Sequence, residues 1–150
     1  MGTYLSTPIL DKGEESGETL EGENYPLTWG VVDMQGWRKS MEDAHVAQTN
    51  IPVPPHLLSI DNNNNNNNCI IRTSTNSNAR IFGVFDGHGG PEVARFCQLY
   101  TVEVLTKQTT WKEETPVIAD PNDPGSSPVG QALIHSFHAL DRMIDDMNRR

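Results

Sequence analysis

Basic residues are scarce in this chain. It has 11 Lys and Arg against 20 Asp and Glu in 150 residues, and a formal net charge of −9. A generic nucleic-acid binder depends on a basic surface that neutralises phosphates, so this balance argues against that class. An acidic chain is instead suited to binding divalent cations through its carboxylates.

Cysteines and long apolar runs are also lacking. The two cysteines, Cys69 and Cys97, lie in unrelated contexts without zinc or disulfide spacing, which favours a reducing compartment. No apolar run approaches the ~18 residues of a membrane span, and no secretory-signal pattern opens the chain. The apolar share of 35% is low for a globular domain, so part of the chain should be loop, although its length fits one domain.

The most informative stretch is Arg80-Ile-Phe-Gly-Val-Phe-Asp86-Gly-His-Gly-Gly90, followed by Pro91. Its apolar run predicts a strand buried on both faces, and Pro91 suits the first turn of a helix. The glycines between them permit positive φ and close approach of a ligand. The stretch therefore predicts a strand, an ion-binding turn and a helix; the alternative is an ordinary turn in which Asp86 caps the helix.

A second polar cluster, Trp37-Arg-Lys-Ser-Met-Glu-Asp43, lies between two expected strands, Leu27–Met34 and about Ala44–Gln48, with Gln35-Gly36 as a break. The guanidinium of Arg38 can bind a phosphate through two parallel hydrogen bonds. Glu42 and Asp43 are adjacent, so both can serve one site only where the backbone is irregular. The alternative is a surface salt-bridge cluster of little energetic value.

These two motifs, Met34 to His45 and Phe82 to Gly90, resemble the first two signature blocks of the metal-dependent type-2C (PPM) Ser/Thr protein phosphatases, in the same order. The resemblance covers roughly residues 29–150 and corresponds to the N-terminal part of that catalytic domain. It implies an α+β fold: the N-terminal portion of an α-β-β-α sandwich, with two central antiparallel sheets flanked by helices.

The resemblance also implies a site with two Mn²⁺ or Mg²⁺ ions that activate a shared water. By position, Asp86 would bridge the ions and the Gly87 carbonyl would be a further metal ligand. Glu42 and Asp43 would hold metal-bound waters.

The remaining implied roles concern the phosphate ester. Arg38 would bind the phosphate, and His88 would protonate the leaving oxygen as a general acid. The expected activity is hydrolysis of phosphoserine and phosphothreonine in proteins by a monomer in the cytoplasm or nucleus, with phosphoproteins and no nucleic acid as partners.

The N-terminal residues 1–26 are expected to form a mobile arm, and residues 27–150 the phosphatase-type domain. Gly2 and Ser6 fit the loose N-myristoylation pattern, which would give weak peripheral membrane association. A run of asparagines, residues 62–68, indicates a low-complexity surface insertion at about 56–79.

Two helices are expected after Pro91. The first has an apolar stripe that includes the buried structural thiol of Cys97, and residues 111–128 are expected to be a loop. The second begins at Ser127-Pro128, with one apolar face (Val129, Leu133, Phe137, Leu140, Ile144 and Met147). His135 and His138, three residues apart, are expected on a solvated or half-buried flank rather than on a metal.

The sequence departs from the family pattern because the later aspartates that complete the metal site are not found; Asp86 lies in the only Asp-Gly, and there is no Gly-Asp-Asn. We therefore expect an incomplete domain. The alternatives are a non-catalytic phosphoprotein-binding or regulatory fragment, and a chain that does not fold alone.

Overall fold

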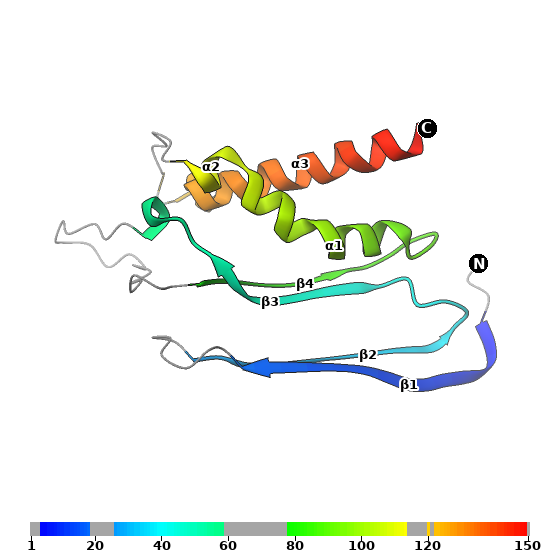
Figure 1. The fold of residues 1–150 in the computed structure, drawn as a ribbon. Helices are drawn as coiled ribbons and strands as arrows, with labels where there is room; N and C mark the ends of the chain where they lie inside the picture. Colours follow the sequence, from blue (N-terminus) through cyan, green and yellow to red (C-terminus); the bar gives the residue numbers. More distant parts are fainter. Residues whose placement is uncertain (1–3, 19–25, 59–77, 114–119, 121, 150) are drawn as a thin grey trace. The chain divides into compact units, whose positions relative to one another are not determined.

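The computed structural model describes residues 4–18, 26–58, 78–113, 120 and 122–149 (Figure 1). Strands and helices follow in this order: β1 Tyr4–Glu18, β2 Thr28–Arg38, β3 Ala44–Pro52, the 3₁₀ turn η1 Pro55–Leu58, β4 Asn78–Phe85, α1 Glu92–Lys107, α2 Thr109–Lys112, the 3₁₀ turn η2 Pro124–Ser126 and α3 Pro128–Asn148. Strands and helices occupy separate parts of this order, which confirms the α+β class.

The strands form a β1–β2 sheet and a β3–β4 sheet. β1 and β2 run antiparallel, with Tyr4 opposite Arg38 at one end and Glu18 opposite Thr28 at the other. The register shifts on either side of Ile9, which lies opposite Gly36, and Gly36 has a φ of +66°. This irregular end of the hairpin includes Arg38 and leads into the connection that carries the acidic pair.

The hairpin differs from the sequence-based expectation at two places. Tyr4–Glu18 falls in the expected mobile arm and forms a strand along the whole of β2. Gln35-Gly36 does not end β2 either, since the strand continues to Arg38. Hydrogen bonding to a neighbouring strand therefore overrides the low strand propensity of a stretch that is rich in Gly, Glu and Ser.

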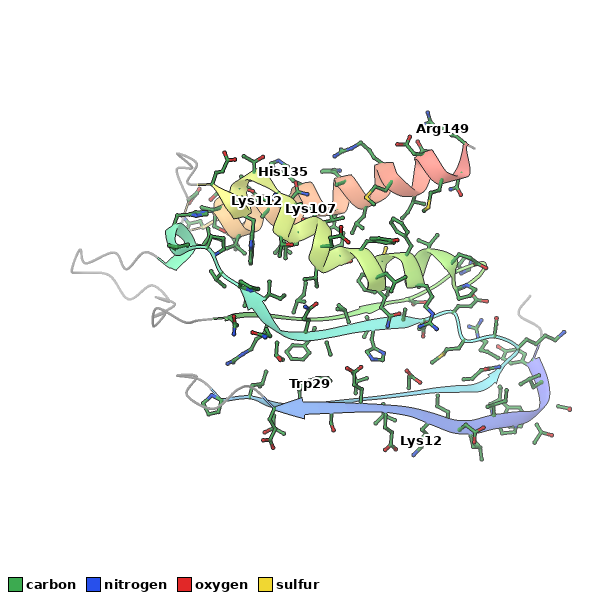
Figure 2. The ribbon with its side chains drawn as sticks, in the orientation of Figure 1. Lys12, Trp29, Lys107, Lys112, His135 and Arg149 are labelled. Carbon is green, nitrogen blue, oxygen red and sulfur yellow. The ribbon has the colours of Figure 1, made fainter. Side chains whose placement is uncertain are left out.

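Two compact units make up the described chain: residues 1–47 with 82–98, and residues 48–81 with 99–150. The first unit contains the β1–β2 hairpin, the start of β3, the end of β4 and the start of α1. Within it, the ring of Trp29 (labelled in Figure 2) meets Phe82 edge to face, with centroids 5.7 Å apart.

The second unit holds the buried apolar cluster. Its buried members come from β3, α1, α2 and α3, namely Ile51, Leu105, Trp111 and Ala132. Partly buried apolar side chains pack around it, including Val53, Leu57, Ala79, Ile81, Val102 and Leu133. Trp111 lies on the short helix α2, so the expectation of a loop from residue 111 is wrong at its start.

The helix starts follow the sequence signals. Arg95 donates its backbone N–H to the Pro91 carbonyl at 2.9 Å, at the first turn of α1. The Ser127 hydroxyl accepts the Gly130 N–H at 3.0 Å, and Pro128 occupies the first turn of α3. The first contact is the opening helical hydrogen bond of α1, and the Ser127 cap satisfies a backbone N–H that the end of α3 would otherwise leave unpaired.

The expected burial of individual faces is partly wrong. Phe82 and Val84 are exposed, so β4 is not buried on both faces. On α1 the buried residues are Ala94, Thr101, Val104 and Leu105, whereas Val93 and Tyr100 of the expected stripe are exposed. On α3 the small residues Ala132 and Ser136 lie inward with Leu140, while Val129, Phe137 and Met147 of the expected face are exposed.

Other expectations fall outside the described residues. The asparagine run and most of the expected insertion, residues 59–77, lie there, as does Gly2. Within the described part of the chain, no helix is long and apolar enough to cross a membrane.

Candidate metal and phosphate site

One polar pocket of about 490 Å³ lies in the first unit, between the β2–β3 connection and the turn after β4. All six residues singled out from the sequence line it: Arg38, Glu42, Asp43, Asp86, Gly87 and His88. Met34, Gln35, Ser40 and Met41 complete the lining. Pocket-lining residues from the two motifs, separated by at least 43 positions in sequence (Asp43 to Asp86), therefore meet at one concave surface.

The connection that carries Glu42 and Asp43 has no strand structure, as the adjacent carboxylates require. Residues 39–43 separate β2 from β3, and both acidic side chains reach the glycine-rich turn. Glu42 Oε2 accepts the Gly89 N–H at 3.2 Å, and Asp43 Oδ1 accepts the Gly87 N–H at 3.2 Å. Each carboxylate thus satisfies one backbone donor of the turn and fixes the two segments against each other.

Gly87 and Gly89 are required for different reasons. A Cβ atom on Gly87 would lie 2.0 Å from the backbone oxygen of Glu42, so the two chain segments touch backbone to backbone there. Gly89 has a φ of +80°, and a Cβ on it would meet no atom within 4 Å. Gly87 therefore provides space, and Gly89 provides a conformation that other residues rarely adopt.

Asp86, Arg38 and His88 are all exposed to solvent. The burial expected for the preceding strand therefore does not extend to Asp86, whose carboxylate can be hydrated by solvent. Its position between the end of β4 and the glycine turn is as predicted, and it remains accessible to an ion from solution.

The donor chemistry of the pocket suits a hard divalent ion, because its acidic groups and the Gly87 carbonyl offer only oxygen atoms. Among the described residues, however, no three His, Cys, Asp or Glu side chains lie close enough to hold one ion. These oxygen donors fit a hydrated ion that has few direct protein ligands.

His135 and His138 do not contribute to such a cluster. Both are exposed on α3, which is the solvated one of the two placements expected (His135 is labelled in Figure 2). No metal-binding group forms around them within the described ranges.

Sequence reasoning did not find the groups that support the pocket. The Ser40 hydroxyl donates to Glu42 Oε1 at 3.1 Å, and Gln35 Nε2 donates to the Arg38 carbonyl at 2.9 Å. A serine two residues before an acidic side chain in a non-strand segment is a local signal that could have indicated the first contact.

His45 was also not foreseen as a contact between strands. Its Nε2 lies 3.1 Å from Glu15 Oε2 on β1, and its Nδ1 lies 3.6 Å from Asp33 Oδ2 on β2. The side chain of Gln98 donates to the His45 carbonyl at 2.6 Å. These contacts hold the start of β3 to the hairpin and to α1, and no sequence pattern specifies them.

The pocket thus brings adjacent carboxylates, a guanidinium and an imidazole together. The comparison with known families shows which family the chain belongs to. The family model described as Protein phosphatase 2C matches residues 28–150, and the chain belongs to the protein phosphatase 2C family.

Individual relatives are consistent with this assignment. The chain is 44% identical to "Probable protein phosphatase 2C 11" of Oryza sativa subsp. japonica over 144 residues, and 37% identical to "Protein phosphatase 2C homolog 2" of Hypocrea jecorina over 145 residues. Both alignments cover 96% of this chain. They cover 28% and 26% of these relatives, so the chain spans about a quarter of their length.

Proposed function

We propose that this chain provides part of a site that hydrolyses phosphoserine and phosphothreonine in proteins with the help of Mn²⁺ or Mg²⁺. The observation that carries the proposal is the convergence of Arg38, His88 and the acidic groups on one pocket. Membership of a family of Ser/Thr protein phosphatases, which in general use these ions, supports the reaction type.

Asp86 and the Gly87 carbonyl would hold the metal, and Glu42 and Asp43 would accept hydrogen bonds from water around it. When bound, the ions would supply a water polarised for attack on phosphorus. Glu42 and Asp43 are already oriented by the turn amides, so they would lose little freedom on binding. Their hydrogen bonds to Gly89 and Gly87 leave further lone pairs on each carboxylate for water.

Arg38 and His88 would act on the substrate. The Arg38 guanidinium would bind two phosphate oxygens and so align the phosphorus with the attacking water. Its position is supported by the Gln35 side chain, which fixes the Arg38 backbone. A protonated His88 would donate its proton to the serine or threonine oxygen as that oxygen leaves.

A second candidate is phosphoprotein binding without turnover, favoured by the exposed guanidinium of Arg38 at the pocket. Arg38 could still bind a phosphate in the absence of catalysis.

The proposed cellular setting follows from the expectations drawn from the sequence. A phosphatase of this kind would meet phosphoproteins as a monomer in the cytoplasm or nucleus. Acylation of Gly2 would add weak membrane association, since one acyl chain gives only marginal binding.

Turnover of a phosphopeptide, measured with and without Mn²⁺, tests the proposal. We expect hydrolysis that chelation and Asp86→Asn both abolish, and that Asp11→Asn leaves unchanged, because Asp11 is an exposed carboxylate on β1 outside the pocket lining. Phosphopeptide binding that Arg38→Ala abolishes, without turnover, would favour the second candidate. Turnover unaffected by Asp86→Asn would refute the assignment of the site.

A further inference from the structure

The Glu42 carboxylate is held at both of its oxygens. The Ser40 hydroxyl donates to Oε1 at 3.1 Å, and the Gly89 N–H donates to Oε2 at 3.2 Å. One donor comes from the β2–β3 connection and the other from the turn after β4, and all three residues belong to the first unit. The carboxylate therefore has a defined plane before any ligand binds.

The geometry points to Ser40 and Gly89 as positioning residues that hold Glu42 in the orientation needed to bind water around a divalent ion. We name Ser40, Glu42 and Gly89 the carboxylate clamp. This inference rests on the proposed function, and adds to it two residues that would act through Glu42 without touching metal or substrate.

The clamp has a physical rationale in the length of the glutamate side chain. A glutamate has three rotatable bonds, and fixing a long polar side chain opposes binding by an amount comparable to one hydrogen bond. Because Ser40 and Gly89 already restrict the Glu42 side chain, binding of a hydrated ion would lose less side-chain entropy. Groups that orient metal-site residues from outside commonly change metal affinity by about 10–100-fold.

Gly89 contributes through its backbone conformation alone. With a φ of +80°, the Gly89 N–H donates to Glu42. The space beside Gly89 is open, because a Cβ there would meet nothing within 4 Å. Gly89→Ala thus perturbs the conformation without a steric clash. Gly89→Asn is the matched variant, since asparagine adopts positive φ more readily than alanine.

The first test needs no metal. NMR of the 150-residue chain reports the Glu42 side-chain rotamer through three-bond couplings, and the Gly89 amide through its proton shift. We expect one dominant Glu42 rotamer in the natural sequence, and rotamer averaging with a displaced Gly89 amide in Ser40→Ala. Ser40→Thr should preserve both signals, and Ser16→Ala, which removes an exposed hydroxyl on β1, should change neither.

The second test is Mn²⁺ affinity by calorimetry on the same proteins. Because the Ser40 contact is exposed, we expect a loss of about threefold to tenfold in Ser40→Ala, with Ser40→Thr near the natural value. Gly89→Ala should weaken binding more than Gly89→Asn. Circular dichroism of each variant excludes unfolding as the cause.

The outcomes separate the clamp from the proposed function. If the natural chain takes up Mn²⁺ through Asp86 but Ser40→Ala and Gly89→Ala bind it equally well, the clamp is overturned and the metal site stands. Unchanged Glu42 couplings in Ser40→Ala also overturn the clamp, whatever the metal result. If the natural chain takes up no Mn²⁺, the metal site fails, and with it the clamp's role toward an ion.

Discussion

Substitution of Gly87 by alanine gives the most direct test of how the pocket is built. The added Cβ would lie 2.0 Å from the Glu42 backbone oxygen and 2.7 Å from its carbonyl carbon. Ordinary contact begins near 3.4 Å, so the turn and the β2–β3 connection must separate by about 1.4 Å. Backbone atoms on both sides cannot rotate away as a side chain could, so the two segments must move as a whole.

That movement should break the hydrogen bond of 3.2 Å between the Gly87 N–H and Asp43. Overpacking of this kind destabilises by about 1–3 kcal/mol. The Gly87 carbonyl and Asp86 would move with the turn, so we expect Mn²⁺ affinity to fall at least about tenfold, equivalent to ~1.4 kcal/mol. Calorimetry with Mn²⁺ and thermal unfolding by circular dichroism measure the two effects.

Gly83→Ala on β4 is the matched control. Its Cβ would meet only Val46 Cγ1, at 3.4 Å, which is tight but involves one movable methyl group. We expect Gly83→Ala to keep the natural Mn²⁺ affinity. If Gly87→Ala bound Mn²⁺ as tightly as the natural chain, the close approach of the two segments would have no role in holding the site, and the reasoning would be refuted.

Three further predictions concern the rest of the chain. Leu105→Ala should lower the free energy of unfolding in denaturant by about 2–5 kcal/mol, because Leu105 is 4% exposed. Leu99→Ala, at a position that is 68% exposed, should have little effect, and equal effects would place the core elsewhere. Burial raises the pKa of the Cys97 thiol, so alkylation by iodoacetamide at pH 8 should be slower than for a peptide thiol. The stability that this neutral thiol contributes should be complete below the ordinary thiol pKa and lost as the pH rises through the raised value; pH-independent unfolding across that range would contradict it. Lys107→Gln should lower the free energy of unfolding by less than about 0.5 kcal/mol, and by less still in high salt, because the Lys107–Glu103 pair is exposed on α1. A decrease of several kcal/mol would contradict this.

Local signals predicted the parts of the fold whose cause lies within a few residues. The Ser127-Pro128 start of α3 needed only a hydroxyl and a fixed φ, and β4 followed by a glycine turn and a helix is equally local. The pairing of β1 with β2 depends on residues up to 34 positions apart, such as Tyr4 and Arg38, and β1 has no alternation that would indicate it.

Helix faces were predicted less well for a similar reason. The sequence predicted that α3 has a buried face, but it did not predict which residues form that face. Ala132 and Ser136 are buried, because small side chains allow close packing in the second unit. Hydrophobic periodicity gives large side chains more weight than small ones, so it rotated the expected face toward Phe137, which is exposed. Trp111 was missed because its surroundings are polar and its helix has four residues.

The candidate site shows the same limit within one turn. The need for a glycine at position 89 follows from a left-handed backbone, which a glycine-rich sequence already indicates. The need at position 87 arises from a chain segment 45 residues earlier, the carbonyl of Glu42, and no local pattern contains it. Gly87 and Gly89, in one motif, are therefore required for different reasons, one spatial and one conformational. Gly89→Asn and Gly87→Ala should consequently differ in their effect on Mn²⁺ affinity, although both replace a glycine of the same turn.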